Sequence, residues 1–105
     1  MRAVGNFELQ VLQVLQQEPS DAYGVTILER ITARIGKEPS TGALYTTLDR
    51  LDKKGYIDSW WGEATPERGG RRKRYYKINA QGVFALTRTL AQVQAFSPVL
   101  VPQGA

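Results

Sequence analysis

Residues 55–79 read GYIDSWWGEATPERGGRRKRYYKIN, and this stretch decides the fold. Apolar and aromatic residues lie on both sides of a segment that contains Pro66, Gly69 and Gly70. Runs of this kind around proline and glycine are typical of a β-hairpin, so we predict strands over 56–63 and 72–78 and a turn over 64–70. Helical patterns flank the hairpin on either side, which makes it a candidate wing attached to a helical core.

Apolar residues recur at helical spacing in the rest of the chain. We predict helices over 6–17, 23–35, 41–54 and 80–96. Asn6, Ser40 and Asn79 are the predicted N-caps, and Gly36 and Gly55 are expected to close the second and third helices. The residues expected to face inward on the second and third helices are Val25, Ile27, Leu28, Ile31, Ile35, Leu44, Leu48 and Leu51.

This order of elements predicts a mainly α protein with a small β-hairpin, in the α+β class: a winged helix-turn-helix domain plus one C-terminal helix. A chain of 105 residues has the length of one domain. We expect a winged helix DNA-binding domain over 1–79, a dimerisation helix over 80–97 and a flexible tail over 98–105.

Positive charge is concentrated in the hairpin. Residues 66–77 contain six basic residues and one acidic residue, whereas the rest of the chain has one more acidic than basic residue. The net charge of +4 therefore comes from one short segment. Such an asymmetry favours a polyanionic partner, with nucleic acid the first candidate and an anionic membrane surface the second.

Cysteine and histidine are absent from the sequence. This excludes thiol nucleophiles, imidazole bases, disulfides and zinc sites of the Cys/His type. No convergent pair of carboxylates or lysines is visible, so we expect no enzyme activity, no catalytic residue, no cofactor and no metal. The first residues lack the apolar core of a signal peptide, and no stretch is apolar enough for a membrane span. We therefore expect a cytoplasmic protein without a membrane partner.

The outward side of the third helix combines hydroxyl groups, a tyrosine and basic side chains. A solvent-exposed helix face would show a similar mixture, but here it lies after two helices and before a basic hairpin. This setting favours a recognition helix that enters the major groove of DNA, where Gly42 would allow close approach of the backbone. The predicted DNA-binding residues of this segment are Ser40, Thr41, Gly42, Tyr45, Thr46, Arg50 and Lys53.

The second predicted strand begins with four consecutive cations, Arg71, Arg72, Lys73 and Arg74. Strand alternation puts Arg72 and Arg74 on the face of Tyr76, and Arg71 and Lys73 on the face of Tyr75. A basic strand can simply improve solubility. Because four adjacent cations repel one another, we instead interpret them as ligands of DNA phosphates or of a minor groove, which supply affinity more than sequence preference.

Three aromatic residues have more than one interpretation. Tyr23 lies at the start of the second helix, where it is either a core residue or a contact to the DNA backbone. Trp60 and Trp61 are adjacent in a strand, so one should be an ordinary core residue and the other should point outward. The outward tryptophan would line a dimer groove or a ligand pocket, and its role stays open.

The last helix has two apolar stripes, which its own small domain cannot cover completely. Packing against the first helix would account for one stripe. For the other we predict pairing with a second copy of the chain. The predicted dimer-interface residues are Leu9, Val83, Leu86, Leu90 and Val93.

The sequence resembles the PadR-like transcriptional regulators. The resemblance rests on residues 8–15, 23–27, 40–51, 54–57 and 69–78, together with Gly82. A Gly-x-Leu-Tyr motif followed by a hairpin rich in glycine and arginine is the specific combination. Thr46 stands where many members have proline, which we interpret as a different branch of the family. The resemblance implies a winged helix domain, dimerisation through the C-terminal helix aided by the first helix, and usually repression.

We therefore expect a homodimeric regulator of transcription that binds a pseudo-palindromic operator in double-stranded DNA through two third helices and two wings. A small-molecule effector stays open. The alternative is a protein adaptor whose basic hairpin contacts an acidic protein or a membrane. The hydroxyl and tyrosine groups on the third helix favour DNA, since an adaptor has no need of them.

Overall fold

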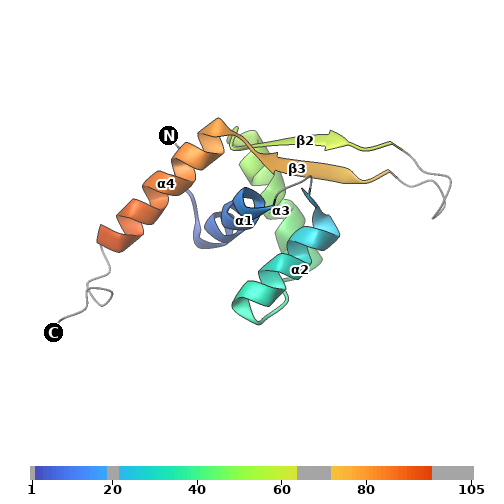
Figure 1. The fold of residues 1–105 in the computed structure, drawn as a ribbon, viewed down its shortest axis with the longest axis horizontal. Helices are drawn as coiled ribbons and strands as arrows, with labels where there is room; N and C mark the ends of the chain where they lie inside the picture. The colour runs from blue at the N-terminus through green and yellow to red at the C-terminus, as the bar shows by residue number, and fades with distance from the viewer. Residues whose placement is uncertain (1, 19–21, 64–71, 96–105) are drawn as a thin grey trace.

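A helical body carries a small antiparallel sheet that extends away from it in this computed structural model, which describes residues 2–18, 22–63 and 72–95 (Figure 1). The elements of these residues are α1 Asn6–Gln17, β1 Ala22–Tyr23, α2 Gly24–Ile35, α3 Thr41–Lys53, β2 Ile57–Trp61, β3 Arg74–Ile78 and α4 Ala80–Ala95. The predicted α+β winged helix fold is confirmed. Arg71, the turn over 64–70, residues 96–97 and the tail over 98–105 lie outside the described residues.

Local hydrogen bonds explain where α3 and α4 begin. The Ser40 hydroxyl accepts a hydrogen bond from the Ala43 N–H at 3.0 Å, and the Asn79 side chain accepts one from the Gly82 N–H at 2.9 Å. Each side chain thereby satisfies a backbone donor that the first helical turn leaves without a partner. Both predicted caps are confirmed.

The first helix is capped differently from the prediction. Gly5, rather than Asn6, is the N-cap of α1. The Glu8 carboxylate accepts a hydrogen bond from the Gly5 N–H at 2.7 Å, as the glutamate of a capping box does. The glutamate thus supports this helix start, which is why a side-chain cap at Asn6 is not needed.

The sheet has one strand that the sequence did not predict. Its order is β1-β3-β2, and both strand pairs are antiparallel. The two-residue strand β1 pairs Ala22 with Tyr76 and Tyr23 with Tyr75. The second helix was predicted to begin at Tyr23, but it begins one residue later because Tyr23 has extended backbone and acts as its N-cap. The two hairpin strands are shorter than predicted.

The hydrophobic core contains residues of every helix and strand in the described part of the chain. Its buried members are Val11, Leu12, Val14, Leu15, Ala22, Ile27, Ile31, Leu44, Leu48, Leu51, Tyr56, Ile57, Tyr76, Ala85 and Leu86. Val25 and Ile35 were predicted to face inward, but they are 56% and 45% exposed. They lie near the two ends of α2, and the buried residues Ile27 and Ile31 lie between them along the helix.

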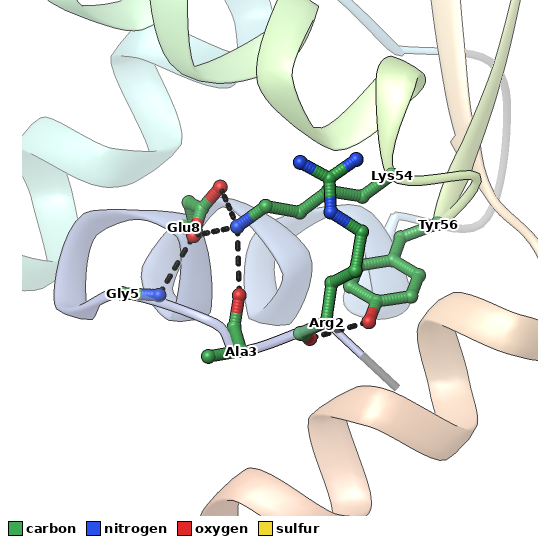
Figure 2. A network of polar contacts seen from close by, with 6 residues as sticks. All are labelled: Arg2, Ala3, Gly5, Glu8, Lys54 and Tyr56. Atoms are coloured by element: carbon green, nitrogen blue, oxygen red, sulfur yellow. Dashed lines mark hydrogen bonds and ion pairs between the residues drawn. The ribbon is translucent and has the colours of Figure 1, made fainter.

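A largely buried ion pair joins the end of α3 to the start of α1 (Figure 2). The Lys54 ammonium lies 2.8 Å from the Glu8 carboxylate and also donates to the Ala3 carbonyl at 2.7 Å. Burial alone would raise the pKa of Glu8. Hydrogen bonds from Gly5 and Lys54 and the positive charges of Lys54 and Arg50 outweigh burial, so this pKa is lowered. The network holds the N-terminal segment against the helix that is the candidate for DNA recognition.

The last helix packs on α1 with its first turns and extends beyond the body with its later turns (Figure 1). Leu86, which we predicted at the dimer interface, is 1% exposed and belongs to the core of the single chain. Of the helices in the described ranges, none has the length and hydrophobicity that a membrane crossing requires.

Candidate nucleic-acid interface

The outward side of α3 is open to solvent along its whole length. All predicted DNA-binding residues of this segment are exposed: Ser40, Thr41, Gly42, Tyr45, Thr46, Arg50 and Lys53. Leu44, Leu48 and Leu51 on the opposite side are at most 1% exposed. Burial of one side therefore fixes which side chains α3 presents to a partner.

Two of these exposed side chains already have partners within the helix. The Ser40 hydroxyl is the cap described above, and Lys53 forms an exposed ion pair with Asp49 at 3.0 Å. Surface pairs of this kind contribute at most about 1 kcal/mol, so a phosphate can replace Asp49 as the partner of Lys53 at little cost. Asp49 also lies on the outward side, where it would discourage a phosphate at its own position.

Tyr45 extends from α3 to the first turn of α2. Gly24, the first residue of α2, is buried against the Tyr45 side chain, and a Cβ atom at Gly24 would overlap the Tyr45 phenol. The tyrosine is nevertheless 45% exposed. Its ring therefore lies at the junction of α2 and α3, with one part packed and the other part open to a ligand.

The cations of the hairpin lie on both faces of the sheet, as alternation predicted. Lys73 is on one face, where its ammonium lies 4.3 Å from the centroid of the Tyr23 ring. The Tyr23 ring also packs edge-on against Tyr75, with 5.9 Å between ring centroids. Tyr23 is thus half-buried on the face of Lys73, and the structure does not bring it together with Arg72 and Arg74 on the other face.

Arg72 and Arg74 share the face of the sheet that carries the buried Tyr76. Their guanidinium carbons lie 5.8 Å and 5.0 Å from the centroid of the Trp61 ring. Because Tyr76 is buried, this is the side of the sheet that faces the helical body. Burial raises the pKa of the Tyr76 phenol, and the neighbouring positive charge of Arg74 opposes this effect.

A chain of hydrogen bonds connects this face to α3. Arg74 donates to the Ser59 hydroxyl at 2.7 Å, and Ser59 donates to the Asp52 carboxylate at 3.2 Å. Asp52 lies on the same flank of α3 as Tyr45. The basic strand, by which we mean residues 72–78, is thereby coupled in position to the helix whose side chains would enter a groove of DNA.

The positions of the two tryptophans were predicted only in part. They point to opposite faces, as predicted, but neither belongs to the buried core. Trp60 stacks on Tyr75 with 6.0 Å between ring centroids, and Trp61 is 52% exposed beside the arginines. Trp61 and the link from Asp52 through Ser59 to Arg74 were missed because they depend on the hairpin register, which pairs Trp61 with Arg74.

The family comparison agrees with this geometry. A model of the transcriptional regulator PadR-like family matches residues 11–88 of the chain. An uncharacterized protein X of Lysinibacillus sphaericus is 30% identical over 80 residues, which cover 74% of this chain and 69% of that protein.

Solved structures show the same fold. A transcriptional regulator from Clostridium thermocellum has a TM-score of 0.74 at 26% identity, over 89% of this chain and 84% of that chain. A PadR family transcriptional regulator from Eggerthella lenta has a TM-score of 0.68 at 26% identity, over 90% of this chain and 83% of that chain.

Proposed function

The chain belongs to the PadR-like family of DNA-binding transcriptional regulators, and from this premise we propose that it is a repressor that binds a pseudo-palindromic operator as a homodimer. In this proposal α3 enters the major groove, and the basic strand contacts the DNA backbone beside it. The proposed place of action is the cytoplasm, and the proposed role is regulatory, not enzymatic.

The observation that carries the DNA-binding proposal is the connection between two polar surfaces. The exposed side of α3 offers Thr41, Thr46 and a half-exposed Tyr45. The hydrogen bonds from Asp52 through Ser59 to Arg74 fix the basic strand relative to this helix. Hydroxyl and phenol groups suit base edges, and guanidinium groups suit phosphates, so one rigid unit presents both kinds of contact.

The support for a dimer is an apolar stripe on α4 that continues past its own core. Leu86, Leu90 and Val93 are spaced for one helix face. Leu86 is 1% exposed, Leu90 is half-buried against the core, and Val93 is 43% exposed. Exposure rises along the stripe because α4 extends beyond the helical body (Figure 1). We propose that a second copy covers the uncovered part.

Phe84 adds a second apolar feature to α4. It is 58% exposed and borders a hollow of about 400 Å³ that is also lined by Tyr56, Gln81 and Lys54. Val83 and Leu9 are half-buried, so they can contribute at most their partly uncovered edges to an interface. A two-fold pairing through α4 would place two copies of α3 for half-sites about 34 Å apart, one turn of DNA.

Recovery of bound fragments from the genome of the source organism tests this proposal. The protein should enrich a small set of fragments that share an inverted repeat, with two chains bound per duplex. Thr41→Ala should bind the same fragments with a smaller preference over mixed-sequence DNA, by about 1–3 kcal/mol for a lost base contact. Fragments enriched without any common sequence, or no fragments at all, would refute sequence-specific binding and leave the adaptor alternative.

A further inference from the structure

Trp61 lies beside two arginines, Arg74 at the start of β3 and Arg72 two residues before it. It is the last residue of β2 and pairs with Arg74 across the hairpin. Its ring centroid is 5.0 Å from the Arg74 guanidinium carbon and 5.8 Å from that of Arg72, within the range of cation–π attraction. Because it is 52% exposed and outside the core, hydrophobic burial does not explain why a tryptophan stands here.

A hydrogen bond holds each guanidinium group at a second point. Arg72 Nε donates to the Gly62 carbonyl at 2.9 Å, and Arg74 Nη2 donates to the Ser59 hydroxyl at 2.7 Å. The ion pairs among the described residues include neither arginine. The two side chains are therefore held on one face of the sheet, and each guanidinium group has N–H donors beyond the one that these hydrogen bonds use.

We propose that Trp61 is a positioning residue that orders Arg72 and Arg74 for the phosphates of DNA before DNA binds. A long side chain that is free in solution loses conformational freedom when it binds, whereas one already held by an aromatic ring loses less. Trp61 carries no charge, so it does not change the number of phosphates contacted. The inference rests on the proposed DNA contact of this strand and extends it to a residue that needs no contact with DNA.

If Trp61 has this role, its removal should weaken DNA binding in a different way from the removal of an arginine. Loss of an arginine removes a phosphate contact, which lowers both the affinity and the slope of its dependence on salt. Without Trp61 the arginines can still contact phosphates, but their side chains must be ordered on binding. This lowers the affinity and leaves the slope unchanged. Phenylalanine attracts cations less strongly than tryptophan, so Trp61→Phe should fall between wild type and Trp61→Leu.

The test measures the affinity of the full chain for a mixed-sequence duplex of about 30 base pairs, long enough for two half-sites, over a range of salt concentrations. Trp61→Leu should bind about tenfold more weakly than wild type with the same salt slope, as expected for two side chains that must be ordered on binding. Trp60→Phe is the matched control on the other face, and it should bind like wild type. Equal melting temperatures would show that all variants are folded.

Two results would overturn the proposal. One is an affinity of Trp61→Leu within about twofold of wild type at every salt concentration, since cation–π contacts of this kind should contribute more. The other is a lower slope in Trp61→Leu, equal to that of the variant Arg72→Ala/Arg74→Ala. If that arginine variant itself binds like wild type, the proposed phosphate contact fails instead, which separates the two hypotheses.

Fluorescence gives a readout that a purely structural role would not change. The chain has two tryptophans, so Trp60→Phe leaves Trp61 as the single reporter. Adding the mixed-sequence duplex should change the Trp61 emission, because phosphates bind the guanidinium groups that contact the ring and displace water from its exposed part. The change should disappear when Arg72 and Arg74 are replaced by alanine. An emission that DNA leaves unaltered would contradict the proposal.

Discussion

The phenol of Tyr45 packs over Gly24, so the candidate recognition helix touches the first turn of α2 at a position where any side chain would collide with it. The first turn of α2 thus fixes the direction of the Tyr45 side chain, which is 45% exposed on α3. The contact is specific to glycine because a Cβ atom would occupy the space of the tyrosine hydroxyl. The orientation of Tyr45 is therefore set before any partner binds.

Gly24→Ala should move the Tyr45 ring and leave the fold intact, because the end of a tyrosine side chain can swing outward. We expect a melting temperature close to that of wild type and a loss of operator preference of about 1–3 kcal/mol, as for a lost base contact. Tyr45→Ala should give a similar loss. The double variant should lose no more than either single variant, and fully additive losses would show that Gly24 does not act through Tyr45.

Replacing Arg72 and Arg74 with alanine should weaken binding to all DNA sequences about equally. Each lost phosphate contact should lower the slope of log affinity against log salt by about 1, because fewer counterions are released. Arg34→Ala is the control, since Arg34 is an exposed cation in the last turn of α2. An unchanged slope in the arginine double variant would mean that Arg72 and Arg74 do not bind phosphates.

Glu8 should make stability depend on pH in acid. Its pKa in the folded protein lies below the ordinary value of 4.5, so its ion pair stabilises the fold above that value. This stabilisation is lost as the pH falls through the lowered pKa. At neutral pH Glu8→Gln should cost about 2 kcal/mol, since it leaves a largely buried lysine without its charged partner.

Denaturation across the acid range checks this prediction. The difference in unfolding free energy between wild type and Glu8→Gln should shrink as the pH decreases below 4.5. Lys54→Met should be about as unstable as Glu8→Gln, and the double variant should be more stable than the sum of the two losses predicts. A difference that stays constant with pH would show that the Glu8 charge does not stabilise the fold.

Val93→Glu should separate the dimer without unfolding the chain. Val93 is 43% exposed in a single chain, so a charge there is tolerated, whereas Leu90 packs against the core and is a less selective site. Burying the new charge between two copies should weaken association about 100-fold or more. Gln92→Glu is the control, because it adds the same charge at an exposed position on another side of α4.

Sedimentation distinguishes the outcomes. Wild type and Gln92→Glu should sediment as dimers, and Val93→Glu should sediment as a folded monomer with weak operator binding. A wild type that is monomeric at micromolar concentration yet binds its operator tightly would show that α4 serves only the core.

Periodicity in the sequence predicted which residues share a face, but it did not predict what covers that face. The stripe of Leu86, Leu90 and Val93 was recognised, yet only the packing of α4 on α1 shows that it begins in the core and ends in solvent. The same limit explains Val25, whose apolar side chain belongs to the right pattern but is 56% exposed.

Some residues of the candidate site could also be predicted from the sequence, and others could not. The outward residues of α3 were predicted because helix geometry fixes them once Leu44, Leu48 and Leu51 are recognised as core. Trp61 was not, because its pairing with Arg74 depends on a hairpin register that the sequence pattern alone leaves open. β1 was not predicted, because a sequence pattern of two residues cannot distinguish a strand from the start of a helix.

An NMR titration of the isotope-labelled chain with the operator duplex tests most directly whether α3 and the basic strand form the DNA-binding surface. Binding should shift the backbone amide signals of residues 40–53 and 72–76 most strongly, with smaller shifts at Tyr23 and Gly24. Amides on the exposed side of α2, around Arg30 and Arg34, should change least. The account would be contradicted if the largest shifts lay on α2 or α4 while residues 40–53 and 72–76 stayed unperturbed.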